Sequence, residues 1–196
     1  MEASEQVAEK FFQQVNLRAE RFTKQEMLRS KTPDFRVFRA QELTLYCEAK
    51  HAQRDEWLDK LLAEAQPLEL VGGLREDPIF NRLSAHIHEA AKQFNAVNPN
   101  HEYPNVLFLT NSDNHSNIYD LTAVLDGNFR SADGELCPIY KQYSEGRIKN
   151  EKFSIDLYLW WNDWMNKPPQ RVWLPSMHHG RLCELLGCAP RPTCQL

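Results

Sequence analysis

The run Val106–Thr110, Val-Leu-Phe-Leu-Thr, is the feature that most constrains the fold of this chain. It is almost wholly apolar and lacks the alternation of a strand with one face in water, so it predicts a strand that is covered on both faces. Such a strand needs helices above and below its sheet. Apolar residues recur at helical spacing over Ser4–Val15 and Leu83–Phe94 and supply candidates for these helices. The chain is therefore expected to form a mixed α/β domain.

The remaining elements follow from the same kinds of pattern. Ser4 is expected to be the N-cap of the first helix. Pro33 lacks an N–H group for strand pairing, so it can only open the first strand. The other expected elements are strands at Phe35–Phe38, Leu43–Cys47, Phe153–Trp161 and Arg171–Leu174, and helices at Asp55–Ala65 and Arg181–Leu186, the last ending at Gly187.

Size and composition favour a soluble protein. A chain of 196 residues with 42% hydrophobic and 26% charged residues is expected to form a single domain over 1–196. No stretch resembles a signal peptide, and the apolar runs are too short to span a bilayer, so a cytoplasmic location is expected. Five cysteines at irregular spacing argue against a disulfide framework.

The net charge of −4 argues against a protein that binds nucleic acid mainly through bulk positive charge. The segment Leu17–Arg39 is an exception, because it carries seven Lys or Arg residues against three acidic ones. Two interpretations stay open for this segment. It is either a solvated loop of mixed charge or a rim that contacts phosphates beside an acidic site.

Two acidic residues and a lysine stand out in the first two strands. Alternation along the second strand places Glu48 and Lys50 on one face, while Cys47 on the other face packs into the core. A hairpin would bring Asp34 alongside them. Two carboxylates so close together repel each other unless a cation lies between them, and their hard oxygens suit Mg²⁺ or Mn²⁺. In the simpler alternative, Asp34 caps a turn and Glu48 pairs with Lys50 in solvent.

The pattern Pro33-Asp34 followed by Glu48-Ala49-Lys50 resembles the PD-(D/E)xK nuclease superfamily. The resemblance implies a restriction-endonuclease-like fold, in which helices flank a mixed central sheet. It places the nuclease-like core at about 5–126 and leaves 127–196 as an extension with strands and aromatic residues. It also implies that Asp34 and Glu48 bind the metal, and that together with Lys50 they are the catalytic residues.

The resemblance extends to both helices beside the sheet. The helix before the sheet often adds a carboxylate in this family, and Glu5 and Glu9 both qualify, with Glu5 fitting the family's spacing better. The helix after the metal-binding strand often carries a polar residue, and Gln93 has a similar position. An ordinary surface glutamine is the simpler interpretation of Gln93.

The expected function is therefore a nuclease that depends on Mg²⁺ or Mn²⁺ and hydrolyses phosphodiester bonds, with DNA as the expected substrate, either alone or as a homodimer. The alternative is a non-catalytic binding or assembly module that meets a partner protein through its tryptophan-rich C-terminal half. That half contains Trp160, Trp161, Trp164 and Trp173. Such residues stack on unpaired bases, form partner surfaces or fill a core, and the core is the commonest use.

Two further groups of residues are candidate metal ligands. The C-terminal region contains His178, His179, Cys183, Cys188 and Cys194, but the cysteine spacings match none of the compact zinc patterns, so ordinary thiols are favoured. His86 and His88 are two apart on an expected helix. They should lie on different faces and make poor joint ligands.

Overall fold

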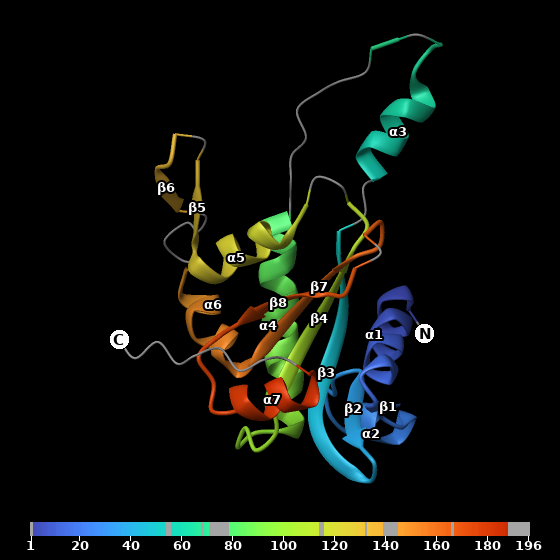
Figure 1. Cartoon of the computed structure of the whole chain (residues 1–196). Coiled ribbons are helices and arrows are strands. Elements are labelled where there is room, and N and C mark those ends of the chain that lie inside the picture. The colour runs from blue at the N-terminus through green and yellow to red at the C-terminus, as the bar shows by residue number, and fades with distance from the viewer. Residues whose placement is uncertain are drawn as a thin grey trace.

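The computed structural model describes residues 2–53, 56–67, 69–70, 79–113, 116–131, 133–138, 145–165 and 167–187. Within these residues, six strands form one mixed sheet in the order β1-β2-β3-β4-β7-β8, with helices on both faces (Figure 1). The strands are β1 (Arg18–Arg21), β2 (Phe35–Arg39), β3 (Glu42–Gln53), β4 (Asn105–Asn111), β7 (Leu157–Asn162) and β8 (Gln170–Trp173). The coarse expectation of a mixed sheet flanked by helices is confirmed.

The helices and a small second sheet complete the described chain. The helices are α1 (Ala3–Gln14), α2 (Lys24–Arg29), α3 (Glu56–Glu64), α4 (Ile79–Val97), α5 (Ile118–Asp126), α6 (Glu145–Glu151) and α7 (His179–Leu185), with a 3₁₀ turn η1 at Lys152–Ser154. The second sheet pairs β5 (Asn128–Arg130) with β6 (Leu136–Pro138). The sequence patterns had not predicted β1, α2, α5, α6 or this small sheet.

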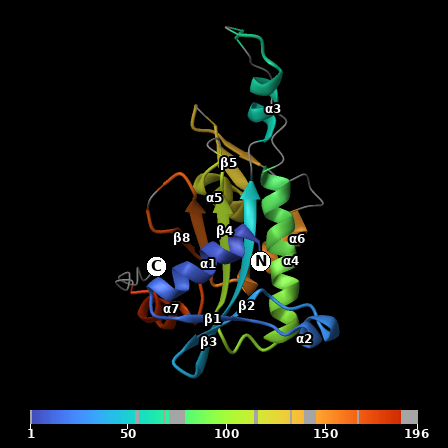
Figure 2. The ribbon, with the colours of Figure 1, turned by 90° about the vertical axis from the view of Figure 1, so that its right-hand side faces the viewer.

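The central strand β4 is buried along its whole length, as its apolar sequence predicts. It runs parallel to both β3 and β7, whereas β1, β2 and β3 form an antiparallel meander and β8 is antiparallel to β7. One core lies between the sheet and helices α1 and α7, and a second lies between the sheet and helices α4, α5 and α6 (Figure 2). The two cores follow from the burial of both faces of the sheet.

The start of α1 corrects the expectation for Ser4. The N-cap is Glu2, whose backbone N–H donates to Glu5 Oε2 at 2.7 Å. A carboxylate three residues into a helix satisfies an otherwise unpaired N–H and interacts favourably with the helix dipole. The helix therefore begins before Ser4, which lies buried in its first turn.

The strand expected over Phe153–Trp161 is shorter than its alternating pattern suggested. Residues Lys152–Ser154 form the 3₁₀ turn, and β7 begins at Leu157. Tyr158 and Trp160, which the alternation places on the opposite face from Leu157, are also fully buried. Because helices cover both faces of the sheet, β7 has no solvent face. The predicted strand at Arg171–Leu174 and the final helix ending at Gly187 correspond to β8 and α7.

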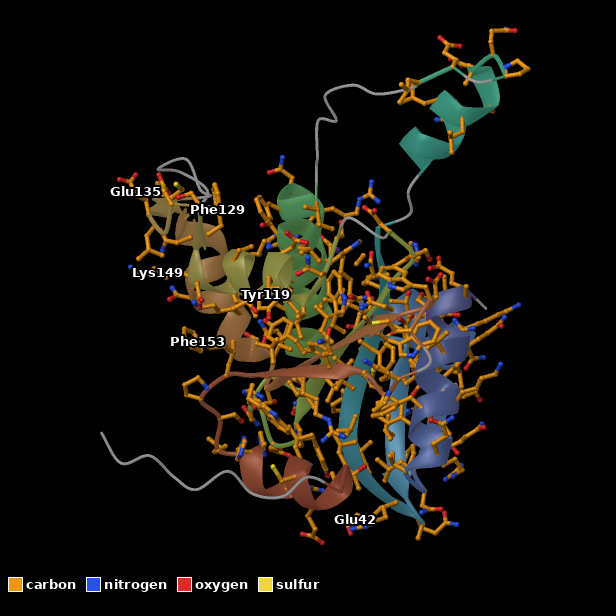
Figure 3. All side chains as sticks on the ribbon, turned by 45° about the horizontal axis from the view of Figure 1, so that its top comes forward. Glu42, Tyr119, Phe129, Glu135, Lys149 and Phe153 are labelled. Carbon is orange, nitrogen blue, oxygen red and sulfur yellow. The ribbon has the colours of Figure 1, made fainter. Side chains whose placement is uncertain are left out.

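Most large apolar side chains that remain in solvent lie outside the sheet. Tyr119, Phe129 and Phe153 lie around α5 and α6 (Figure 3) and are 79%, 41% and 49% exposed. Among the described residues, no helix combines the length and the apolar character needed to cross a membrane.

Two phenylalanines with opposite burial test this arrangement. Phe94 on α4 has no exposed surface, so Phe94→Ala should lower the free energy of unfolding by about 3–5 kcal/mol through lost burial and a cavity. Phe153→Ala is the matched control and should cost less than about 1 kcal/mol. Urea denaturation measures both values. Equal losses for the two variants would contradict the placement of α4 against the sheet.

Candidate active site

The end of β2 creates the candidate site. The last pair between β2 and β3 on this side joins Phe35 to Cys47, so Glu48 and the residues after it run on past the end of β2. Asp34 immediately precedes β2, and its backbone N–H donates to Glu48 Oε2 at 2.9 Å. In return, the backbone N–H of Ala49 donates to Asp34 Oδ2 at 2.9 Å. The hairpin therefore places Asp34 beside Glu48, as its sequence suggested.

Lys50 completes a compact group of charges. Its Nζ atom forms an ion pair with Glu48 Oε1. The Glu48 side chain has no exposed surface, whereas the Lys50 side chain is 28% exposed and gives the group an opening to solvent. Helix α4 covers the face of β3 on which Glu48 lies, and both Glu48 and Tyr46 are buried there. The pair is therefore not the solvent-exposed ion pair of the simpler alternative.

The environment of the two carboxyl groups raises the pKa of both. Burial, followed by repulsion from Asp34, raises the pKa of Glu48 to about 7. Burial also raises the pKa of Asp34, and the nearby charge of Glu5 adds to the effect. Burial acts to lower the pKa of Lys50, but the carboxylates of Glu48 and Asp34 outweigh it and the pKa rises. Near neutral pH the lysine is therefore charged and Glu48 is only partly ionised.

Of the two glutamates considered on the first helix, Glu5 is the one that acts on Asp34. Glu5 raises the pKa of Asp34, while Glu9 is not among the charges that shift it. Both Glu5 oxygens already have partners: Oε1 accepts from Arg21 at 2.7 Å and Oε2 accepts from the Glu2 backbone. This arrangement favours a contribution by Glu5 through a bridging water over direct ligation.

Gln93 reaches the site from α4. Its Nε2 donates to the backbone carbonyl of Thr32 at 3.0 Å, and its amide also hydrogen-bonds Glu48 and lowers the pKa of that carboxyl. Its Oε1 is buried and makes no hydrogen bond to the described residues. Gln93 is thus more than a surface residue. It fixes both the loop before Asp34 and the Glu48 side chain.

The nearby residues Cys47, His86 and His88 are not suited to act as a nucleophile or as metal ligands at this site. Cys47 is fully buried on the opposite face, and burial with the nearby Asp34 and Glu48 raises the pKa of its thiol well above the usual range. Cys47 is therefore a packing residue, as predicted. His86 bonds the carbonyl of His51 at 3.1 Å, and burial lowers its pKa to about 4, so it is neutral. His88 faces elsewhere and bonds Glu151, which confirms that the two α4 histidines are not joint ligands.

The donor set at this site fits a hard divalent cation. Asp34 and Glu48 are adjacent carboxyls whose pKa values are both raised, first by burial and then by nearby negative charge, so that Glu48 is only partly ionised at neutral pH. A cation that displaces the Glu48 proton would neutralise both groups. The Ala49 N–H points toward Asp34, and a strand residue directs its N–H and C=O to the same side, so the Ala49 carbonyl offers a further oxygen there. These are the ligands that Mg²⁺ and Mn²⁺ prefer.

The basic segment Leu17–Arg39 is largely neutralised by local partners. Five of its seven cations form ion pairs, and these join Arg18 to Glu20, Arg21 to Glu5, Lys31 to Glu89, Arg36 to Glu26 and Arg39 to Glu184. The guanidinium of Arg36 also lies 4.5 Å from the centre of the Phe22 ring. The structure thus favours the mixed-charge interpretation over a free phosphate-binding rim. Pairs this exposed are weak, so their cations can exchange partners.

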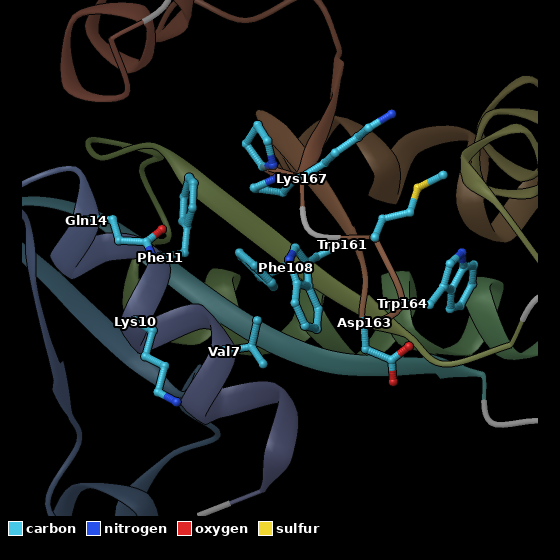
Figure 4. A pocket seen from close by; sticks show the side chains of 12 residues that line it. Val7, Lys10, Phe11, Gln14, Phe108, Trp161, Asp163, Trp164 and Lys167 are labelled. Carbon is cyan, nitrogen blue, oxygen red and sulfur yellow. The ribbon is translucent and has the colours of Figure 1, made fainter.

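A cavity of about 640 Å³ opens on the α1 side of the sheet (Figure 4). Phe108 forms part of its lining and packs in the same core as Ala49, on the face of β3 opposite to Glu48 and Lys50. Trp161 and the half-exposed Trp164 also line it, together with Lys10 of α1. Trp161 also packs against the core on the α1 side, as Trp173 does, whereas Trp160 is fully buried in the core on the α4 side.

The sequence analysis missed one group of side chains altogether. His101, Asp156 and His178 each offer a ligand atom, and these atoms lie within 4.8 Å of one another. Among the His, Cys, Asp and Glu residues that the structure describes, these three meet this distance, whereas Glu5, Asp34 and Glu48 do not. The group joins residues up to 77 positions apart, as the contact between His178 and His101 shows. No local spacing could have revealed it.

Of the C-terminal histidines and cysteines, the three that the structure describes, His178, His179 and Cys183, do not gather at one point. His178 turns to His101, whereas His179 contacts Cys183, with 3.6 Å between Nε2 and Sγ. Cys188 and Cys194 lie outside the described residues. The described cysteines, Cys47, Cys137 and Cys183, are free thiols.

Comparison of the chain with protein families, curated proteins and solved structures finds no match. The site is therefore interpreted from its own geometry and chemistry.

The shifted pKa of Glu48 predicts how the metal-free protein responds to pH. The folded state holds the Glu48 proton up to about pH 7, whereas the unfolded chain releases it near 4.5. This stabilisation is complete below pH 4.5 and disappears as pH rises through 7. Between pH 5 and 8, stability in EDTA should therefore fall by an amount on the order of 3 kcal/mol from this group.

Glu48→Gln provides the control for this effect, because a glutamine does not titrate. Urea denaturation at several pH values should give a flatter stability curve for Glu48→Gln than for the wild type. Other groups, such as His101, titrate in both proteins and cancel in the comparison. Parallel curves for the two proteins would show that Glu48 is not a buried carboxyl of raised pKa.

Proposed function

We propose that this protein is a divalent-metal-dependent nuclease that hydrolyses phosphodiester bonds, with DNA as its substrate. The observation that carries the proposal is the buried pair of carboxyls, Asp34 and Glu48, with the charged Lys50 bonded to one of them. The same residues carry the resemblance to the PD-(D/E)xK superfamily. DNA as the substrate follows from that resemblance.

Asp34, Glu48 and the Ala49 carbonyl would hold the metal, with Glu5 contributing through water. A bound Mg²⁺ or Mn²⁺ would polarise the scissile phosphate and lower the pKa of a water molecule there. Burial supports this role of the residues, because charges removed from bulk solvent act more strongly on each other and on a bound substrate. The backbone N–H groups of Asp34 and Ala49 donate to the Glu48 and Asp34 carboxyls and hold them in place before any ligand arrives.

Lys50 would act on the substrate side of the site. Its side chain is partly exposed. Once a metal ion neutralises Glu48 in place of Lys50, the ammonium group can face an incoming phosphate. The raised pKa of Lys50 keeps it protonated at neutral pH, which suits it to orient the attacking water and to stabilise negative charge on the phosphate. Gln93 would position Glu48 by its hydrogen bond and would not itself contact the substrate.

Substitutions that preserve shape test these roles. Asp34→Asn keeps an oxygen for the Ala49 N–H but loses the charge, and Lys50→Met keeps most of the apolar stem. Each should reduce metal-dependent DNA cleavage by about a hundredfold or more, because each removes an interaction with the reacting phosphate or its metal. Cleavage is measured on labelled single- and double-stranded DNA with Mg²⁺ or Mn²⁺, and with EDTA as the blank.

Lys24→Ala is a matched control, since Lys24 is an exposed lysine of the basic segment on α2. This variant should cleave DNA at the wild-type rate. Thermal unfolding at pH 5.5 checks that all variants fold. Wild-type rates in a folded Asp34→Asn or Lys50→Met protein would refute the assigned roles.

A second candidate is a binding module that uses the aromatic cavity on the α1 side. The cavity favours it, because Trp164 and Met165 are 42% and 40% exposed there and tryptophan is enriched at binding hot spots. The two candidates differ in the residue that matters. In a binding module, Trp164→Ala would abolish binding of the partner, and Asp34→Asn would leave that binding intact.

A further inference from the structure

The cluster of His101, Asp156 and His178 lies at the end of the sheet where β4 and β7 begin. His101 is in the loop between α4 and β4, Asp156 immediately precedes β7, and His178 immediately precedes α7. Each provides one ligand atom within 4.8 Å of the other two. Two imidazoles and a carboxylate are a ligand set that zinc uses in proteins, with a fourth position completed by water.

The Asp156 carboxylate is held in place by groups that do not compete with a metal for its charge. It is 2% exposed. Its Oδ2 accepts the backbone N–H of Asn105 at 2.7 Å, and its Oδ1 accepts the hydroxyl of Ser176. Ligating carboxylates in metal sites are commonly oriented by such outer hydrogen bonds, because a fixed ligand loses less freedom on binding.

His178 is oriented in the same way. Its Nε2 lies 2.8 Å from the carbonyl oxygen of His101. A carbonyl only accepts, so Nε2 carries the proton and Nδ1 keeps the lone pair. Metal-binding histidines usually donate their second ring N–H to a carbonyl or carboxylate. His178 is 8% exposed, so its imidazole is held by the protein and not by solvent.

His101 supplies the movable part of the site. Its Nε2 lies 2.7 Å from Asp156 Oδ2, and its side chain is 30% exposed. Ligands bound at about 2.0–2.1 Å in a tetrahedron are roughly 3.3 Å apart, so the two atoms must separate by about half an ångström to admit the ion. A half-exposed loop residue can make this movement, and its open side gives water access to the fourth position.

We propose that His101, Asp156 and His178 bind Zn²⁺ and that the ion fastens α7 to the sheet. Leu182 and Leu185 of α7 pack in the core shared with α1, so a link at the start of α7 would stabilise that core. The site is independent of Asp34 and Glu48. Its imidazole nitrogens select zinc, whereas the all-oxygen site selects Mg²⁺ or Mn²⁺.

The test is a calorimetric titration of Zn²⁺ into the full chain carrying Asp34→Asn, which disables the carboxylate site. One equivalent should bind, and the thermal midpoint should rise by on the order of 5 °C at saturating Zn²⁺. Replacing Zn²⁺ with Co²⁺ should give the visible absorption bands of a tetrahedral ion. Adding His101→Gln or His178→Gln should weaken binding by about a hundredfold and abolish the thermal shift.

His88→Gln is the control, because His88 lies on α4 and bonds Glu151 away from the cluster. It should bind Zn²⁺ like its Asp34→Asn parent. If His178→Gln fails to fold, His101→Gln decides, since His101 is partly exposed. If the parent does not bind Zn²⁺, or if His101→Gln binds it unchanged, the proposal is overturned. The three residues would then only connect these segments through hydrogen bonds.

Discussion

The fold places a carboxyl group, Glu48, where it has no contact with water. Glu48 is buried because β3 is an inner strand and α4 covers the face on which its side chain lies. Burying a lone carboxylate is costly, and the protein offsets that cost with the Asp34 backbone N–H, the Lys50 ammonium and the Gln93 amide. The Asp34 carboxylate has the opposite effect, because its negative charge repels that of Glu48. The site therefore remains electrostatically strained until a proton or a cation neutralises it.

The mixed sheet makes this arrangement possible. The antiparallel meander ends at Phe35, while β3 continues to Gln53 alongside the parallel strand β4. Past the end of β2, no strand among the described residues pairs with β3 on that side, so its N–H and C=O groups can contact Asp34 and a ligand. The same two-sided burial separates the carboxyl site from the aromatic cavity. The cavity and the Glu48 side chain lie on opposite faces of the sheet.

Local patterns predicted much of this organisation and failed where distant residues meet. The apolar run in β4 and the helical spacing of α1 and α4 gave the sheet and its covering layers, and alternation placed Glu48 beside Lys50. Alternation failed for Tyr158 and Trp160, because it cannot distinguish a half-buried strand from one covered on both faces. The raised pKa of Glu48 and the His101 cluster depend on burial and on contacts between distant segments. A single sequence contains no signal for either.

Calorimetry can test whether Asp34 and Glu48 bind a divalent metal ion. Mn²⁺ is titrated at pH 7 into the wild type, Asp34→Asn and Glu48→Gln, with His178→Gln as the control. One Mn²⁺ site is expected in the wild type and in His178→Gln, and it should be lost in both carboxyl variants. Binding should also release a proton, seen as a dependence of the heat on the ionisation enthalpy of the buffer. Absence of binding, or equal binding by Asp34→Asn, would contradict the assignment of Asp34 and Glu48 as a metal site.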